Sequence, residues 1–339
     1  MNDVLRERIR GMFLGVLIGD ALGMPVEIFT PAQIAAKYGR VTAYQKPEVR
    51  DGASDLWSAK PAGSYTDDTQ LTLAVIDGIV AAKGLDMAEQ VKSHLAAYDE
   101  SVCGWGGTTT AALKNLKNGI HWTSSAPRKN GLGRGNAIPM KIAPVAAYVA
   151  AYVMQFPGEK CAAMAPNDIF GFLRAFARMT HCDSEALAAG VAHYRGLLHC
   201  LLSGASPLGD AFLTSVCFDR SECPVFYDAM DFALSYRGED AIEKIGGVGR
   251  ARFLSLHSVP LAYHCFWRNP NSIESLYSAV NAGGDTDTNA SMVGALLGAK
   301  HGRSIFPEEL VRGLHPASLA QVSAATDSFL ELFRDLAPE

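Results

Sequence analysis

The sequence predicts an all-α protein, and two observations about its apolar residues lead to this class. In the segment 69–82, leucine, isoleucine and valine recur three and four positions apart, as on one face of a helix. The alternation of apolar and polar residues that marks half-buried strands is nearly absent from the chain. We therefore expect helices throughout and no substantial sheet. Further segments with the helical pattern are 111–116, 142–154, 168–179, 184–202, 252–267, 273–280 and 290–300.

The length of the chain by itself favours two domains, because its 339 residues are roughly twice a common domain size of ~150. The sequence contains no low-complexity linker, however, and its glycine clusters are spread between helical segments. We therefore predict one domain over residues 1–339. The stretches 157–166 and 203–240 are expected to be surface insertions.

The composition is that of a folded protein with a large core, since 48% of the residues are hydrophobic and 19% are charged. Lys and Arg number 30 against 35 Asp and Glu, which gives a net charge of -5. Proteins that bind nucleic acid through its phosphates usually carry a basic surplus. Nucleic acid is therefore not expected as the main partner.

The cysteines and the N-terminal segment indicate the cellular compartment in which the protein is expected. The seven cysteines lack CxxC spacing, which favours reduced thiols in a cytoplasmic protein over a zinc site. The apolar run 12–19 resembles part of a signal peptide, but Asp20 follows it directly and no cleavage site is present. No other apolar stretch reaches the ~20 residues of a membrane span. We expect a soluble cytoplasmic protein without a membrane partner, and the sequence indicates no oligomeric state.

Two short acidic motifs, 66–69 and 285–288, each precede an apolar helical segment. Each motif supplies two carboxylates at a predicted helix start. One aspartate per helix is explained by N-capping and by the helix dipole. A second carboxylate beside it repels the first unless a cation lies between them. From the residues alone, helix capping and metal binding both stay open.

The ligand types restrict the metal, if one is bound. Carboxylate and hydroxyl oxygens without nearby His or Cys suit Mg²⁺, Mn²⁺ or Ca²⁺ rather than Zn²⁺. The spacing of Asp285, Asp287 and Asn289 imitates the start of an EF-hand loop, but Ala290 and Leu296 occupy the positions that require Gly and Glu. Four carboxylates from two loops are enough for a two-metal centre that binds a diol and orients a water molecule.

Several segments, in the same order along the chain, resemble the ADP-ribosylglycohydrolase family. The resemblance extends from about Gly11 to Gly302. The segments that carry it are 11–15, 19–23 with Glu27, 65–69, 135–141, 180–181, 258–260 and 283–288. It implies a single orthogonal multi-helix bundle, all-α, with a dinuclear metal cleft that holds two divalent cations, Mg²⁺ or Mn²⁺.

The resemblance also assigns expected roles to individual residues. The expected metal ligands are Thr66, Asp67, Asp68, Asp285, Asp287 and Thr288. Glu27, which matches a mobile loop glutamate of the family, is expected to be catalytic together with Asp285 and Asp287. The expected substrate-binding residues are Gly104, Gly106, Gly107, Gly135, Asn136, Met140 and His181. Without the resemblance, the glycines are turn residues and His181 is a core histidine.

The implied function is hydrolysis of the glycosidic bond between ADP-ribose and a modified acceptor, on a protein or a small conjugate. ADP-ribosyl-arginine is the first choice of linkage, and serine-linked ADP-ribose and O-acetyl-ADP-ribose are the alternatives. A non-catalytic ADP-ribose-binding or immunity protein and a metal-dependent phosphoester hydrolase also stay open. Ala137, Pro139 and His257 depart from the family pattern, so substrate preference is where we expect differences.

Overall fold

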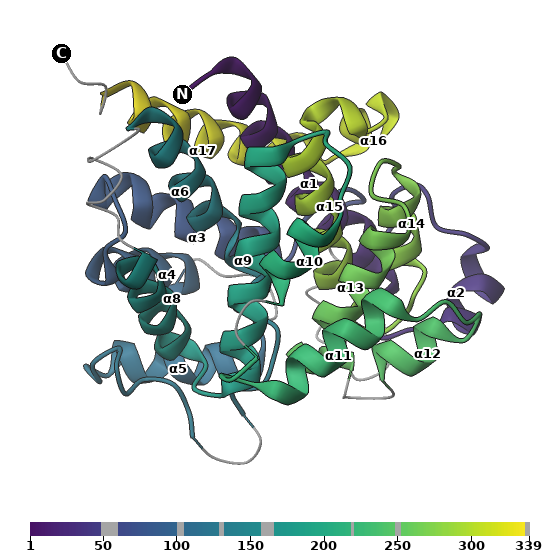
Figure 1. Ribbon diagram of the computed structural model, residues 1–339, viewed down its shortest axis with the longest axis horizontal. Helices are drawn as coiled ribbons and strands as arrows, with labels where there is room; N and C mark the ends of the chain where they lie inside the picture. Colours follow the sequence, from purple (N-terminus) through teal and green to yellow (C-terminus); the bar gives the residue numbers. More distant parts are fainter. Residues whose placement is uncertain are drawn as a thin grey trace.

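The computed structural model describes residues 1–48, 60–99, 105–128, 132–156, 166–217, 220–247 and 252–335. The regular structure of these residues is helical, as Figure 1 shows, and their β-pairing is limited to a bridge between Gly135 and Leu254. The all-α prediction is confirmed. The helices are α1 (Asp3–Gly23), α2 (Pro31–Tyr38), α3 (Asp67–Ala82), α4 (Met87–Asp99), α5 (Gly107–Lys117), α6 (Ala143–Gln155), α8 (Pro166–Thr180), α9 (Ser184–Ser203), α10 (Asp210–Val216), α11 (Pro224–Ser235), α12 (Ala241–Gly246), α13 (Ser255–Arg268), α14 (Glu274–Val280), α15 (Thr286–His301), α16 (Glu308–Gly313) and α17 (Pro316–Asp335), with 3₁₀ turns η1 (Met24–Val26), η2 (Pro139–Lys141) and η4 (Arg303–Ile305).

The centre of the bundle is the antiparallel pair of α1 and α15, whose backbones touch. Glycines recur every fourth residue of α1, at positions 11, 15, 19 and 23. A Cβ atom on Gly15 would lie 2.1 Å from the carbonyl oxygen of Gly294, and one on Gly19 would lie 2.1 Å from that of Ala290. No side chain other than hydrogen fits at such a distance. This contact sets the end of α1 against the start of α15.

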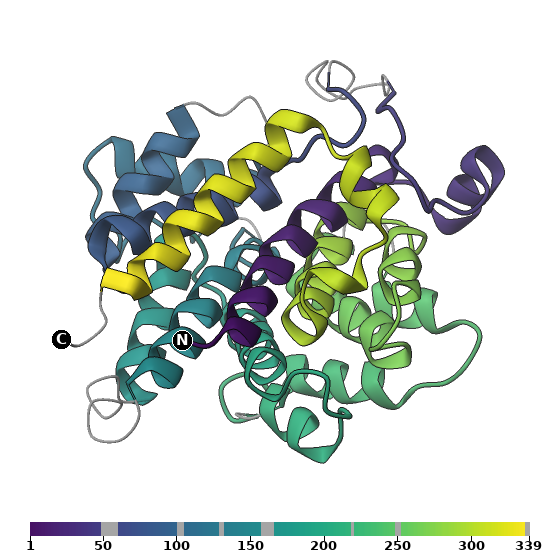
Figure 2. The ribbon, with the colours of Figure 1, turned by 90° about the horizontal axis from the view of Figure 1, so that it is seen from above.

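Helix α1 is a core helix in this fold. The span Asp3–Val26 is long and apolar enough to cross a membrane by composition alone, and 94% of its most apolar window is buried by the rest of the protein. Its burial comes from α15 and from α17, which runs beside it in Figure 2. Its apolar residues are therefore explained by packing.

The stretch 203–240, expected to be a surface insertion, contributes to the core instead. Its described part contains α10 and α11, and the side chains of Phe212, Phe226 and Met230 are fully buried. Phe212 stacks on Trp267 of α13 with ring centroids 5.8 Å apart. That expectation is wrong, because the apolar residues of two short helices were too few to show a clear period. Most of the other predicted insertion, at 157–165, lies outside the described residues.

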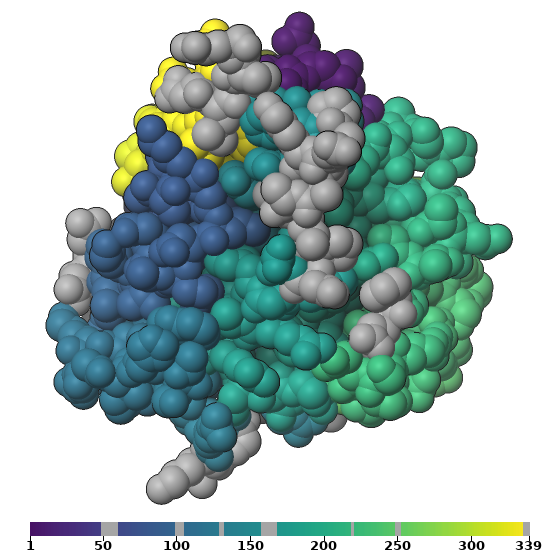
Figure 3. Space-filling view, turned by 60° about the vertical axis from the view of Figure 1, so that its left-hand side comes forward, coloured from purple at the N-terminus to yellow at the C-terminus, as the bar shows by residue number. Residues whose placement is uncertain are grey.

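Helices from the first and second halves of the chain lie on different sides of the face shown in Figure 3. In the space-filling view, the blue segments that include α3, α4 and α5 and the green segments beyond α9 lie on either side of teal α8 and α9 (Figure 3). Helix α3 contacts both α1 and α15. The N-terminal ends of α3 and α15 therefore meet, and each carries one of the acidic motifs.

Candidate metal centre and cleft

The first turns of α3 and α15 carry the acidic motifs without using them as caps. The N-cap residues, Thr66 of α3 and Asp285 of α15, make no side-chain capping hydrogen bond. Helix capping therefore does not account for the two carboxylates at each start. Predicted helix 290–300 begins earlier than expected, at Thr286, since Thr and Asp are tolerated in a first turn and an anion there is favoured by the dipole.

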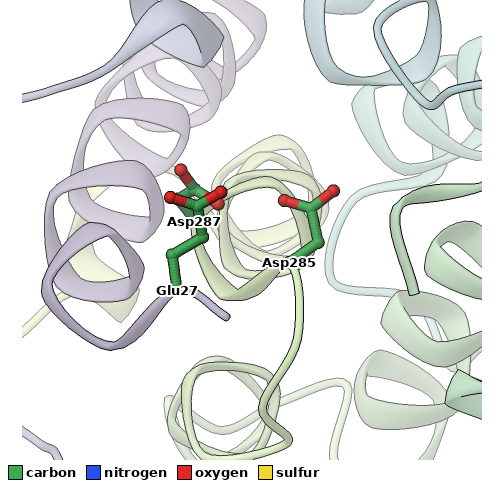
Figure 4. A group of neighbouring side chains, drawn as sticks. All are labelled: Glu27, Asp285 and Asp287. Carbon is green, nitrogen blue, oxygen red and sulfur yellow. The ribbon is translucent and has the colours of Figure 1, made fainter. Parts of the chain in front are cut away.

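The two motifs, more than two hundred residues apart in the sequence, are in contact. The Thr288 hydroxyl donates to Oδ2 of Asp68 at 3.1 Å. Carboxylate oxygens of Glu27, Asp285 and Asp287 all lie within 4.8 Å of one another, and Figure 4 shows Glu27 approaching the start of α15 from the segment that follows α1. Three of these aspartates, Asp68, Asp285 and Asp287, are at most 4% exposed. The acidic motifs form one buried cluster.

This cluster is electrostatically costly in the absence of a cation. Burial, followed by the charge of Asp287, raises the pKa of Asp68 well above its ordinary value. Burial together with Glu27 raises the pKa of Asp285 to about 7, and burial together with Asp20 raises that of Asp67 to about 7. The pKa values of these aspartates are raised because like charges lie close together where water solvates them poorly.

One oxygen in the cluster has no hydrogen bond. Oδ1 of Asp68 is shielded from solvent and has no hydrogen-bond partner among the described residues. A buried, unsatisfied carboxylate oxygen costs several kcal/mol unless something positive contacts it. The donor set is all oxygen, as hard divalent cations require. The residues present therefore fit a divalent metal site.

Neighbouring polar side chains hold the ligands in place. Asn136 donates to Oδ2 of Asp285 at 2.6 Å and to the Ser258 hydroxyl at 2.9 Å. Ser258 in turn donates to Asn289, on α15, at 2.7 Å. Groups hydrogen-bonded to a ligand fix its orientation. Asn136, expected to bind substrate, thus also positions Asp285.

Sequence reasoning missed Asp20 as a functional candidate. Its carboxylate is fully buried and accepts hydrogen bonds from four groups at 2.6–3.0 Å. These groups are the backbone N–H and the side-chain hydroxyl of Thr66 and the same two groups of Thr69. A charged residue inside an apolar helix needs such partners, and that was the available signal. Asp20 fixes the backbone from which Asp67 and Asp68 project.

The cluster lies at one end of a cleft with about 800 Å³ of empty space, open solvent included. The predicted site residues that line it are Glu27, Asp67, Asp68, Gly106, Gly107, Gly135, Asn136, Met140, His181, Asp285, Asp287 and Thr288. Thr66 is fully buried behind the wall and donates its hydroxyl to Asp20, and Gly104 lies outside the described residues. Phe253 and Leu254 also line the cleft, and sequence reasoning missed both.

The loop of Glu27 is fastened to the second acidic motif. The N–H of Ile28 donates to the carbonyl of Gly284 at 2.7 Å, and the N–H of Gly284 donates to the carbonyl of Phe29 at 2.8 Å. Ile28 has a φ of 65°, an unusual conformation for a β-branched residue. These two hydrogen bonds hold the strained backbone and keep Glu27 beside Asp285 and Asp287.

The cleft also contains the N-terminus of a helix and a neutral histidine. Gly106 and Gly107 begin α5 and are exposed, and the backbone N–H of Gly106 donates to the Asp67 carboxylate. The N-terminus of a helix favours anions such as phosphate. Burial, followed by the charge of Lys141, lowers the pKa of His181 to about 3. Its ring is therefore neutral and can hydrogen bond a ligand.

The fold and cleft define an all-helical protein with a buried cluster of carboxylates that fits a divalent metal. Comparisons with known proteins give the family: the chain belongs to the ADP-ribosylglycohydrolase family, whose model matches residues 1–338. Members of this family are glycosidase-type hydrolases that act on ADP-ribose linkages, and this chain is an enzyme of that kind.

The similar proteins align with nearly the whole length of this chain. The ADP-ribosyl-dinitrogen reductase glycohydrolase of Rhodospirillum rubrum is 24% identical, over 97% of each chain. An ADP-ribosylarginine hydrolase of Pseudomonas putida is 24% identical, over 93% of this chain and 77% of that protein. A solved structure named as an ADP-ribosylglycohydrolase-related protein complex has a TM-score of 0.69 at 24% identity, over 98% of this chain and 99% of that one. That likeness shows the shared fold.

Proposed function

We propose that this protein is a metal-dependent hydrolase that releases ADP-ribose from ADP-ribosyl-arginine on a target protein. The observation that carries the proposal is the buried acidic cluster with its unsatisfied Asp68 oxygen, in a cleft that also contains the N-terminus of α5. Arginine linkage is favoured because a relative that aligns along most of its length is named an ADP-ribosylarginine hydrolase. A second relative is named for a modified protein, dinitrogen reductase.

We propose two divalent cations, Mg²⁺ or Mn²⁺, as the cofactors. The proposed ligands are Thr66, Asp67 and Asp68 from the start of α3, and Asp285, Asp287 and Thr288 from the start of α15. Thr66 and Thr288 already donate their hydroxyl hydrogens to Asp20 and Asp68, which leaves an oxygen lone pair of each for a cation. When bound, the cations would supply positive charge to ribose hydroxyls and to a water molecule.

In the proposed mechanism the protein positions the substrate and moves one proton. Cleavage at the anomeric carbon of the ribose passes through an oxocarbenium-like transition state. The half-buried Glu27 carboxylate accepts the proton of the attacking water as general base and passes it to the departing guanidine nitrogen, and Asp285 and Asp287 lie beside Glu27 as further catalytic groups. The Gly106–Gly107 segment at the N-terminus of α5 binds the diphosphate, with the N–H of Gly107 as a donor, and His181 hydrogen bonds the ligand.

We further propose that the protein acts in the cytoplasm on a protein target. The described cysteines at 182, 200, 217, 223 and 265 are free thiols, which supports a reducing compartment.

A substrate panel tests the proposed function. Purified protein with Mg²⁺ or Mn²⁺ is incubated with ADP-ribosyl-arginine, ADP-ribosyl-serine, O-acetyl-ADP-ribose and a phosphoester, and released ADP-ribose or phosphate is measured. We expect release of ADP-ribose, fastest from the arginine conjugate. Faster release from another ADP-ribose conjugate would show that its linkage, rather than the arginine linkage, is the preferred substrate. Activity on the phosphoester alone would refute the proposal.

A further inference from the structure

A second hollow adjoins the cleft and belongs to none of the proposed roles. It contains about 1250 Å³ of empty space, open solvent included, and most of its lining side chains are polar. The lining includes Thr123, Ser124, Arg128, Arg134, Arg178 and Asp183. Its lining residues come from the C-terminal end of α8 and from the segment that follows α5.

The hollow is positively charged in a chain whose net charge is -5. Three arginines face one aspartate, and that aspartate caps α9 by accepting the N–H of Glu185. Arg134 is held by a bidentate ion pair with Glu185. Arg128 and Arg178 are exposed and form no ion pair with any described residue. Two guanidinium groups are therefore available to an anion, and planar guanidinium groups favour phosphate.

The backbone that separates the hollow from the cleft is thin. A Cβ on Gly135 would lie 3.5 Å from Nε2 of His181, and both residues line the cleft. A Cβ on Gly133 would lie 3.4 Å from Sγ of Cys182, and Cys182 lines the hollow. The segment 133–135 thus packs against 181–183 and forms the rim between the two cavities. Arg134 lies on this rim, next to cleft residue Gly135.

A ligand whose adenosine end lies against Gly135 and His181 would end close to the arginines. If the ribose to be released lies at the acidic cluster and the diphosphate near Gly106 and Gly107, the adenosine end extends toward Gly135 and His181. A further negative group on the adenosine would pass the rim and meet Arg128, Arg134 and Arg178.

We propose that this hollow binds a phosphate group attached to the adenosine end of the ADP-ribose ligand. The inference rests on the proposed function for the position of the nucleotide, and it adds a preference for ligands that carry an extra phosphate. Each exposed guanidinium–phosphate contact strengthens binding about threefold, so the contacts of Arg128 and Arg178 together give roughly a tenfold gain. Because the arginines are exposed, this gain shrinks at high salt.

Calorimetry with matched ligands and matched variants tests the proposal. The ligands are ADP-ribose and its derivatives with a phosphate on the adenosine 2′ or 3′ oxygen, which show the hydroxyl that faces the hollow. The test protein carries Arg128→Gln and Arg178→Gln. The control carries Arg312→Gln and Arg334→Gln, two exposed arginines of α16 and α17 with the same change in charge.

We expect one phosphorylated ligand to bind the wild type and the control roughly tenfold more tightly than ADP-ribose does. In the test protein the difference falls below about twofold, while ADP-ribose binds all three proteins equally. Binding of ADP-ribose without any gain from the phosphate, or a gain that survives in the test protein, would overturn this inference alone. Failure of every ligand to bind would overturn it together with the proposed function. A defect seen only with a modified protein substrate would reassign the hollow to an acidic segment of the target and also overturn the inference.

Discussion

Thr288 donates its hydroxyl hydrogen to Asp68 at 3.1 Å, and this bond joins the first turn of α15 to the first turn of α3. The other oxygen of the same carboxylate, Oδ1, is buried without a partner. One oxygen of Asp68 is thus used to align two helices, and the second is left for a cation.

Removal of this bond should weaken metal binding without unfolding the protein. In Thr288→Val the shape is kept, but Asp68 loses a donor and the proposed site loses a ligand. We expect roughly 10- to 100-fold weaker Mn²⁺ binding, the usual effect of such changes near a metal. Titration calorimetry measures it. Thr326→Val, which removes a buried hydroxyl of α17 remote from the cluster, serves as control and should bind Mn²⁺ normally.

Asp20 should be important for both stability and metal binding. In Asp20→Asn, an acceptor-only carboxylate becomes an amide whose NH₂ group faces the donors of Thr66 and Thr69. We expect a loss of about 2–4 kcal/mol in unfolding free energy, measured by urea denaturation. Because the first metal loop is released, Mn²⁺ should also bind more weakly. A variant as stable as wild type would show that this network contributes little.

A glycine substitution in the close contact between α1 and α15 should have the opposite effect to one at an exposed helix position. Gly19→Ala places a Cβ 2.1 Å from a backbone carbonyl oxygen, so we expect a loss of more than about 3 kcal/mol or no folded protein. Gly171→Ala, in α8, meets nothing within 4 Å and should stabilise the protein by about 0.5–1 kcal/mol, because alanine favours helix. Thermal unfolding compares the two, and equal effects would contradict the packing described.

His193 predicts how stability changes in acid. Burial lowers its pKa from 6.5 to about 3, and its Nδ1 lies 3.3 Å from the Tyr263 hydroxyl. The unfolded chain therefore binds a proton below pH 6.5 that the folded protein does not, so stability is lost as the pH falls. At pH 4.5 this group alone should cost about 2–3 kcal/mol. His193→Gln should reduce the loss of unfolding free energy between pH 7 and pH 4.5 by that amount, and an unchanged loss would mean that His193 is protonated in the fold.

Much of this fold was readable from the sequence because its helices are amphipathic and long. The periodic segments 69–82, 142–154 and 184–202 correspond to α3, α6 and α9. The paired acidic motifs were readable because two adjacent carboxylates exceed what capping needs. The contacts between residues distant in the sequence could not be predicted. Periodicity does not show that Gly19 contacts Ala290, or that the Thr66 hydroxyl donates to Asp20.

The remaining gaps have local causes. The left-handed backbone of Ile28 is held by hydrogen bonds to residue 284, and no residue near Ile28 indicates it. Phe253 and Leu254 looked like ordinary apolar residues before α13 until the fold brought them to the cleft. The expectations of a single domain over 1–339, of the individual ligand roles and of a cytoplasmic location stay predictions.

The central claim is that the acidic cluster is a metal centre required for release of ADP-ribose. The most direct measurement is the rate of ADP-ribose release from ADP-ribosyl-arginine by protein freed of metal with a chelator and then given increasing Mg²⁺ or Mn²⁺. We predict no release of ADP-ribose without metal and recovery of the rate when metal is added. In Asp68→Asn and Asp285→Asn the rate should not recover, because these variants lack a carboxylate whose pKa is raised in the cluster. Metal-free protein that is as active as the restored enzyme would contradict it.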